Sequence, residues 1–354
     1  MNEGVVGAVS YPAGAIWPYR LVTSIWKRLL DDFPDSLTIE TNTPVKSITT
    51  SAKGKSSSRP NFPYAIETAR GVIHARHVVH ATNAWASHLV PGLRSRITGA
   101  RAHMSAQMPG DAFPSRPKGD RSWSVFYSGG GFDYVTQRPA ASPSPSSSHP
   151  SHSSGKDKKP ASAAGDLMLG GGFMRSPGQG MDQVGIYNDG DQPDALTTTH
   201  LFGILPAIFA PNWGRGAELK QLWTGIIGMT GDLVPFVGRL DEKMTGRKVV
   251  RRRRGSRASR SSDSGRVEAL RDPGEWIAAG YSGEGMVWAW LSGTALGVMM
   301  ADTDGERRDN EEEDEVEDIP GQPRGLLKDW FPEELGVSRA RLRTAHVSNL
   351  AEQF

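Results

Sequence analysis

Residues 275–300, EWIAAGYSGEGMVWAWLSGTALGVMM, constrain the fold of this chain more than any other segment. A short apolar run leads into a glycine-rich turn, which leads into small and apolar residues at helical spacing. Gly283 and Gly285 lack a Cβ atom, so the backbone there can approach a flat ligand closely. The first N–H groups of the following helix lack intrahelical partners and lie at the positive end of its dipole. The segment therefore predicts a strand, a turn and a helix that either face an anionic ring or are buried without a ligand.

Small and apolar side chains on one face of this helix predict tight packing against a sheet. They are Ala289, Ser292, Gly293, Leu296, Gly297 and Met300. Nearer the N-terminus, Pro18 suits the first turn of a helix whose apolar residues keep helical spacing as far as Pro34. The pattern further predicts strands at SLTIET and PVKSITT, a hairpin with its turn at Gly71, strands at 97–106, 122–127, 132–137, 166–173 and 218–228, and a helix near 194–210.

Composition is typical of a globular protein with polar inserts. The 354 residues are 37% hydrophobic with a formal net charge of +2, which leaves room for two domains. No apolar run reaches the roughly 18 residues of a membrane span, and no charged-then-apolar leader opens the chain. We therefore expect a cytoplasmic protein with no nucleic-acid or membrane partner. The absence of cysteine excludes disulfides, zinc–thiolate sites, thiol catalysis and attachment of a cofactor through cysteine.

Three segments break the globular pattern, and we expect disordered inserts at 139–164, 241–272 and 302–320. The first is rich in serine and proline and buries too little apolar surface to fold. The second contains KVVRRRRGSRASRSS, which is either a nuclear-import signal or a solvated surface run. The third contains the acidic stretch EEEDEVED.

Other chemistries find little support. His74, His77 and His80 are three residues apart in a strand-like run, so neighbours in the series point to opposite faces and do not converge on a metal. GYSGE departs from the G-x-S-x-G turn of serine hydrolases at Glu284. The glycine clusters at 129–131 and 170–172 lack the Lys-Ser/Thr of a phosphate-binding loop. We expect no metal site.

Four segments in order carry a family resemblance. They are YPAGAIWPYRLVTSIWKRLL at 11–30, VVHATNAWASHLVPGL at 78–93, WTGIIGMTGDLVPFVG at 223–238 and GYSGEGMVWAWLSG from residue 280. Together they resemble the FAD-dependent oxidoreductases of the D-amino-acid oxidase and glycine/sarcosine oxidase superfamily, in a form familiar from fungal members. Asn83 stands where the family usually has glycine, a mild departure because Asn tolerates a left-handed backbone.

The resemblance implies an α/β fold of mixed α+β type, with the remnant of a Rossmann-like FAD/NAD(P)-binding domain and an antiparallel-sheet substrate domain. We expect residues 1–18 and 93–240 in the substrate-side domain, 19–92 and 273–301 in the FAD-binding remnant, and 321–354 as a C-terminal extension. No G-x-G-x-x-G turn, which would hold the FAD pyrophosphate, occurs in the sequence. We therefore expect a flavoprotein truncated at its N-terminus, with impaired FAD binding.

The resemblance also implies the site residues, although no catalytic residue is assigned. The implied FAD contacts are Val45, Ala81, Thr82, Asn83, Trp85, Gly283, Glu284, Gly285 and Met286. The implied substrate-side residues are Arg101, Arg175, Trp223 and Asp232. The arginines are candidates because a planar guanidinium binds both oxygens of a substrate carboxylate.

The implied reaction is oxidation of a C–N bond in a small amine or amino acid. Hydride passes from the carbon beside the amine to the flavin, water hydrolyses the resulting imine, and molecular oxygen reoxidises the flavin with release of hydrogen peroxide. Orientation against the flavin supplies most of the rate effect, so no dedicated acid or base is expected. The alternative is a non-catalytic remnant that acts, if at all, as an interaction protein.

Overall fold

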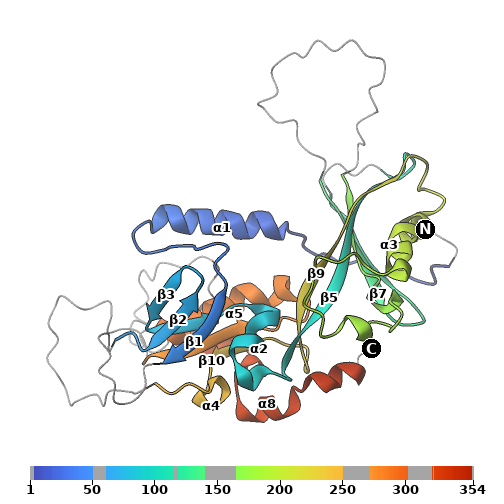
Figure 1. Cartoon of the computed structure of the whole chain (residues 1–354). Coiled ribbons are helices and arrows are strands. Elements are labelled where there is room, and N and C mark those ends of the chain that lie inside the picture. The colour runs from blue at the N-terminus through green and yellow to red at the C-terminus, as the bar shows by residue number, and fades with distance from the viewer. Residues whose placement is uncertain are drawn as a thin grey trace. The chain divides into compact units, whose positions relative to one another are not determined.

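The computed structural model describes residues 4–50, 61–114, 119–139, 165–249, 272–301, 321 and 323–352. The chain forms two compact units (Figure 1). Unit 1 comprises residues 1–17, 100–226 and 354, and unit 2 comprises 18–99 and 227–353. The predicted inserts lie outside the described residues, except for residues 139, 241–249 and 272.

Unit 1 is built on a five-stranded sheet in the order β6-β7-β8-β5-β9. Its strands are β5 (Ile97–Met108), β6 (Ser122–Phe126), β7 (Phe132–Gln137), β8 (Leu167–Gly170) and β9 (Glu218–Thr230). The pairs β6–β7, β7–β8 and β5–β8 are antiparallel. The five strands predicted from sequence for this region are therefore confirmed.

The helix of unit 1, α3 (Ala195–Phe209), begins where the sequence predicts it. Asp194 caps it, because Oδ1 accepts from the N–H groups of Leu196 and Thr197 at 2.9 and 3.1 Å. Leu201 and Leu205 are fully buried in one cluster with alternate residues of the sheet. The cluster comprises Phe113, Val135, Leu167, Leu169, Leu201, Leu205, Phe209 and Trp213. The core of unit 1 thus lies between α3 and one face of the sheet.

Unit 2 contains two three-stranded sheets. One is the antiparallel meander β1 (Val45–Thr50), β2 (Tyr64–Thr68) and β3 (Gly71–Ala75). The other has the order β10-β11-β4, with β10 (Phe236–Arg239) antiparallel and β4 (His77–His80) parallel to β11 (Gly274–Ala279). All residues of β11 are buried, as expected for an apolar run in a central strand.

The meander confirms two sequence predictions and corrects a third. PVKSITT forms β1, and the hairpin turns at Gly71, whose φ of +133° suits glycine. SLTIET was predicted as a strand, and this is wrong, because residues 36–41 form no strand. The N–H of Leu37 donates to the carbonyl of Phe33, and a turn with Asn42 at φ +51° follows. These turns at both ends leave too short a run to pair with a neighbouring strand.

The predicted first helix is confirmed as α1 (Pro18–Asp32), and none of its residues is buried. The helix after the glycine-rich turn is α5 (Gly285–Ala301), with Ser292, Ala295, Leu296 and Val298 buried. Its predicted packing face is wrong in part. A Cβ atom added at Gly293 or Gly297 would meet nothing within 4 Å, because these glycines lie on the side of α5 turned away from β11.

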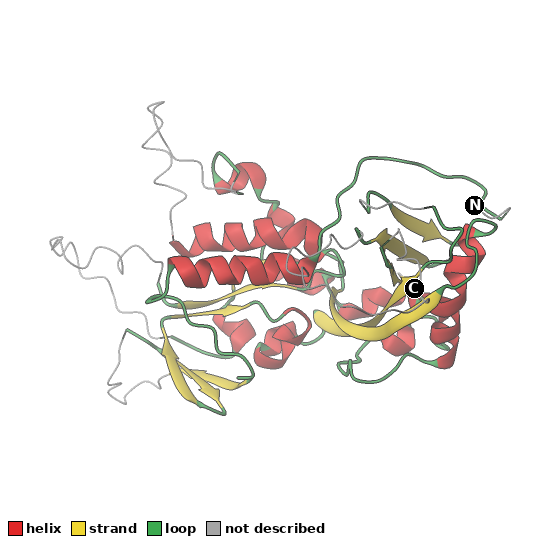
Figure 2. Ribbon diagram, turned by 90° about the horizontal axis from the view of Figure 1, so that it is seen from above, coloured by secondary structure: helices red, strands yellow, loops and turns green. Residues whose placement is uncertain are grey.

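Short helices complete the chain (Figure 2). They are α2 (Ala86–Leu89), α4 (Glu242–Thr245), α7 (Leu327–Trp330) and α8 (Arg339–Thr344), with 3₁₀ helices η1 (Asn83–Trp85), η2 (Pro91–Leu93), η3 (Phe173–Arg175), η4 (Met181–Gln183), η5 (Glu333–Leu335) and η6 (Val347–Glu352). In the described part of the chain, no helix combines the length and the apolar character that a bilayer crossing requires.

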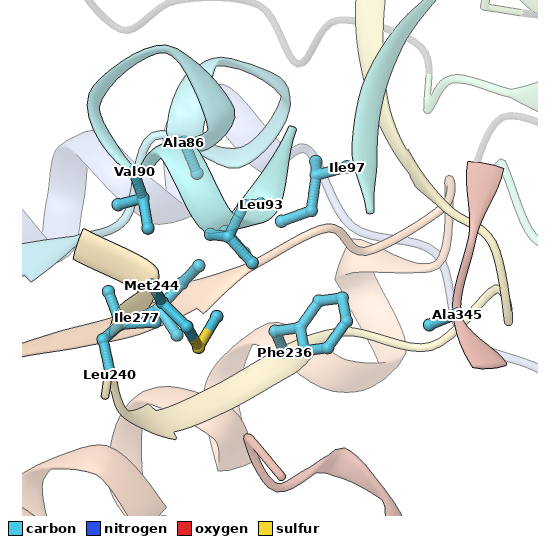
Figure 3. Close-up of a cluster of buried hydrophobic side chains, with 10 residues drawn as sticks. Ala86, Val90, Leu93, Ile97, Phe236, Leu240, Met244, Ile277 and Ala345 are labelled. Atoms are coloured by element: carbon cyan, nitrogen blue, oxygen red, sulfur yellow. The ribbon is translucent and has the colours of Figure 1, made fainter. Parts of the chain in front are cut away.

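The main core of unit 2 gathers side chains from η2, β10 and β11. Figure 3 shows Leu93, Phe236 and Ile277 in this cluster, and all three are fully buried. The predicted mixed α/β fold with an antiparallel-sheet part is confirmed.

Candidate functional site

Two turns of unit 2, one after β4 and one after β11, meet beside strand β9. Oδ1 of Asn83, after β4, accepts from the N–H groups of Gly280 and Tyr281, after β11, at 2.9 and 3.2 Å. The N–H of Ser282 donates to the carbonyl of Gly228 at 2.8 Å. Because β4 and β11 are parallel, their carboxyl ends lie at the same edge of the sheet. The turn that follows Ala81 is therefore joined directly to the glycine-rich turn.

The backbone at this junction is left-handed at several positions. The φ angles are +46° at Asn83, +85° at Gly280, +50° at Ser282 and +89° at Gly283. Asn adopts this conformation more readily than most residues, so Asn83 suits a turn at which the resemblance implies glycine. A Cβ atom at Gly228 would lie 2.5 Å from Oδ1 of Asn83, so glycine is required there for the close approach.

The first turn of α5 presents free donors. The carbonyl of Glu284 accepts from the N–H groups of Val287 and Trp288, at 3.0 and 3.1 Å. The N–H groups of Gly285 and Met286 donate to no acceptor among the described residues. They lie at the positive end of a 17-residue helix. This arrangement suits a ligand with negative charge on one edge.

This surface is open. A Cβ atom at Gly283 would meet nothing within 4 Å, and Met286 is 64% exposed. The structure brings together the predicted cofactor residues of the two turns. These are Ala81, Thr82, Asn83 and Trp85 with Gly283, Glu284, Gly285 and Met286. Val45 lies in β1, which belongs to the other three-stranded sheet of unit 2.

The two predicted substrate arginines lie in unit 1. Arg101 contacts the loop between β8 and α3, and Arg175 belongs to that loop. Nε of Arg101 donates to Oε1 of Gln183 at 2.9 Å, and its Nη1 is 4.0 Å from Asp191. Arg175 lies in η3, with its guanidinium carbon 4.7 Å from the centroid of the Tyr127 ring. Arg101 therefore has polar partners, whereas Arg175 is held by an aromatic face.

The other two predicted substrate-side residues, Trp223 and Asp232, have different surroundings. Trp223 follows Leu222, which packs against the core of unit 1, so alternation places Trp223 on the opposite face of the sheet. Both oxygens of Asp232 accept from Arg341, at 2.7 and 3.1 Å. Arg341 is buried and also donates to three main-chain carbonyls. The Asp232 carboxylate thus ties its turn to α8.

The sequence analysis missed a buried ion-pair cluster in unit 2. Glu275 in β11 accepts from Nε of Arg247 at 2.7 Å and from Nη2 of Arg247 at 2.5 Å, and it lies 2.9 Å from Nε2 of His80. Burial raises the pKa of Glu275, but the hydrogen bonds from Arg247 and His80 outweigh it and hold the pKa below its usual range. The signal in the sequence was a carboxylate inside the apolar run EWIAA.

Comparison with known proteins places this chain in a family. Residues 1–298 match the family described as DAO, FAD dependent oxidoreductase. Glycine oxidase from Geobacillus kaustophilus is 16% identical with a TM-score of 0.44, over 74% of this chain and 49% of that one. Iminodiacetate oxidase from Chelativorans sp. BNC1 is 13% identical with a TM-score of 0.44, over 79% and 54%.

An Amadoriase I mutant from Aspergillus fumigatus is 12% identical with a TM-score of 0.42, over 77% of this chain and 48% of that one. The chain thus spans about half the length of the solved structures that it matches. No curated protein sequence matches it. The family match extends over most of the 354 residues, so the chain belongs to the FAD dependent oxidoreductase family.

Proposed function

We propose that unit 2 provides the ring-facing part of an FAD site in an enzyme that oxidises a C–N bond of an amine or amino acid. The observation that carries this proposal is the pair of free N–H groups at Gly285 and Met286, beside the turn that Asn83 bridges. Membership of the family supports FAD as the cofactor. Bound there, the flavin would supply the acceptor for hydride from the carbon beside the amine, with molecular oxygen as the final acceptor.

The residues present fit such a ring. Gly283 leaves open space above the backbone, and the donors of Gly285 and Met286 lie at the positive helix end. We propose that the two turns, residues 81–85 and 283–286, hold the ring edge. We propose that Val45 contacts FAD only on its adenine side, because Val45 lies in the β1-β2-β3 sheet.

The proposed task of the substrate-side residues is orientation. Unit 1 supplies Arg101 and Arg175 for a substrate carboxylate and Trp223 for an apolar contact. Asp232 keeps its turn in place through Arg341. No side chain needs to move a proton if the substrate enters as the free amine, because alignment supplies most of the effect.

We further propose that the FAD pyrophosphate is held by a strand–turn–helix unit outside these 354 residues, which contain no G-x-G-x-x-G. Two surfaces of unit 2 support this. β4 lies at the edge of its sheet, with Val79 45% exposed. α1 has no buried residue, and Leu21, Val22 and Trp26 are exposed. A parallel strand followed by a helix would cover such surfaces.

A flavin titration of the 354-residue chain tests both proposals. We expect riboflavin and FAD to bind with similar, weak affinity, because only the ring surface is available, and Gly285→Val to weaken both about tenfold. Gly293→Val is the matched control, since Gly293 lies in open space on the same helix. Equal loss in both variants, or no change in flavin absorbance with any of the proteins, would overturn the ring site. Much tighter binding of FAD than of riboflavin would overturn the outside pyrophosphate unit.

Peroxide release on addition of amines or amino acids tests the reaction. A chain that binds flavin but releases no peroxide with any of them would favour the non-catalytic alternative.

A further inference from the structure

A pocket of unit 2 lies at the end of the β10-β11-β4 sheet opposite the glycine-rich turn. β10 is antiparallel to β11, and Arg239 near its end pairs with Trp276 near the start of β11. The glycine-rich turn follows the other end of β11, after Ala279. The pocket begins at Arg239 and has a volume of about 380 Å³, within the range of roughly 300–1,000 Å³ usual for small-molecule sites. It is therefore a separate site from the two turns proposed to hold the flavin ring.

The floor of this pocket is apolar. Met244 in α4, Val337 before α8 and Leu342 in α8 line it. Met244 is buried in the main core of unit 2, as Figure 3 shows, and Val337 and Leu342 pack against the same core. A Cβ atom at Gly92 would lie 2.6 Å from the Cα of Met244, so α4 packs directly on η2. The core thus holds an apolar surface in place at the bottom of the pocket.

Cationic side chains line the same pocket in excess. Among the described residues, four cations face one carboxylate, and they are Arg239, Lys243, Arg339 and Arg343 against Asp241. Arg339 and Arg343 are four residues apart in α8, so they lie on the same face of the helix, where like charges repel each other. An anion bound between these side chains would relieve that repulsion.

Asp241 is already engaged and does not neutralise the whole set. Its Oδ1 accepts from the N–H of Lys243 at 2.8 Å, and its Oδ2 accepts from Nη2 of Arg339 at 3.0 Å. These two hydrogen bonds hold the pKa of Asp241 below its usual range. Within the described part of the chain, neither the Lys243 ammonium nor the Arg343 guanidinium forms a hydrogen bond or an ion pair. Their charges are available to a ligand.

Arg239 is fixed by the fold before any ligand binds. Its Nη2 donates to the carbonyl of Pro273 at 2.8 Å. Its guanidinium carbon lies 5.4 Å from the centroid of the Trp276 ring. Lys243 and Arg343 are exposed, so their long side chains can adjust to the bound group. The pocket therefore combines one positioned cation with two adjustable ones.

We infer that this pocket binds an organic anion, whose apolar body covers Met244, Val337 and Leu342 and whose carboxylate or phosphate group pairs with the surrounding cations. The two groups share one chemistry, because a guanidinium binds two oxygens of either. The inference goes beyond the proposed function and does not depend on flavin. Every residue that lines the pocket belongs to unit 2.

The test is isothermal titration calorimetry of the full 354-residue chain without flavin. The probes are octanoate and octyl phosphate, with octanol as the neutral match, and acetate and inorganic phosphate as the charged groups without an apolar body. We expect at least one octyl anion to bind about tenfold more tightly than octanol and than either small anion. The tighter octyl anion identifies the group that the pocket prefers.

A double variant tests the place of binding. Lys243→Gln with Arg343→Gln removes both unpaired cations, so we expect the affinity for the octyl anion to fall about tenfold. The matched control is Lys46→Gln with Lys328→Gln, which removes the same charge from exposed lysines of unit 2 outside the pocket. A melting curve of each variant separates loss of binding from loss of fold.

Three outcomes would overturn the inference. They are no binding of either octyl anion by the wild-type chain, equally tight binding of octanol, and equal weakening in the control variant. A failed flavin titration with intact binding of the octyl anion would instead reject the proposed function alone.

Discussion

Glu275 in unit 2 and Asp133 in unit 1 are both buried carboxylates in β-strands, and each is bonded to a histidine. They differ in the rest of their partners. Glu275 also binds the guanidinium of Arg247 through both oxygens. Asp133 also accepts from the Tyr127 hydroxyl and a main-chain N–H, while Arg175 lies over the Tyr127 ring.

Arg247 thus forms a closed ion pair, in which its charge is matched by a buried carboxylate. Arg175 is an open cation, one with no ion pair among the described residues. The charge of Arg247 is neutralised inside the protein by Glu275. Removal of Arg247 would therefore leave a buried carboxylate without a compensating positive charge. The charge of Arg175 is not needed by Asp133, whose hydrogen bonds already stabilise the ionised form. A guanidinium that contributes little to stability yet is held in place is available for a ligand.

The largest expected effect comes from breaking the closed pair. Arg247→Leu leaves Glu275 buried with His80 alone, so we expect a loss of about 3–5 kcal/mol in the free energy of unfolding. Urea unfolding measures it. The control is Lys243→Leu, at an exposed lysine in α4. A loss below about 1 kcal/mol, typical of a surface pair, would show that the pair is not closed.

Asp133→Asn tests the hydrogen-bonded carboxylate. The amide keeps an acceptor oxygen but loses the charge, so we expect a loss of about 1–3 kcal/mol at neutral pH, against no change for the exposed Asp120→Asn. Because the folded-state pKa of Asp133 is lowered, its contribution is complete above the unfolded pKa of about 3.9 and is lost as the pH falls from there through the lower folded-state pKa. The difference between wild type and variant should therefore shrink below about pH 4, as acid titration of the unfolding midpoint would show.

Two buried histidines extend the comparison. His80 is hydrogen-bonded to Glu275, whereas neither ring nitrogen of His103 has a hydrogen-bond partner among the described residues. Burial, with help from Arg101, lowers the pKa of His103, so its neutral form is favoured in the folded state. Its contribution is then complete above the unfolded pKa of about 6.5 and is lost as the pH falls from there through the lower folded-state pKa, by at most about 1.4 kcal/mol per pH unit. We expect His103→Leu to flatten the decline in stability between about pH 6.5 and 5. An unchanged slope in that variant would assign the decline to other groups.

The smallest expected effect is that of Arg175→Gln on stability. Only a stacking contact is lost, so we expect a change of about 1 kcal/mol or less in the free energy of unfolding. Thermal unfolding of Arg175→Gln and of Arg247→Leu under the same conditions compares the two losses of stability directly. A loss as large as that of Arg247→Leu would mean that Arg175 is a structural cation, and the two regions would no longer differ.

Local pattern was sufficient for the regular elements and for the turn residues of the candidate site. The spacing of apolar residues from Pro18 predicted α1, and the strands of unit 1 were predicted from the sequence as well. Gly283 and Gly285 predicted the open turn before α5, and the cluster with Asn83 followed from the resemblance. Such signals depend on residues within one or two turns of each other, which the sequence records directly.

Tertiary structure alone decided which distant groups meet. Arg341 binds Asp232 across 109 positions, and His200 reaches Asp133 across 67. SLTIET has the composition of a strand but lacks a neighbour to pair with, and half of the predicted face of α5 points away from the sheet. Hydrogen bonds, ion pairs and strand pairing depend on where the whole chain places its elements. No spacing rule within one segment contains that information, so the sequence by itself determined the elements and the glycine turn, and the fold decided their partners.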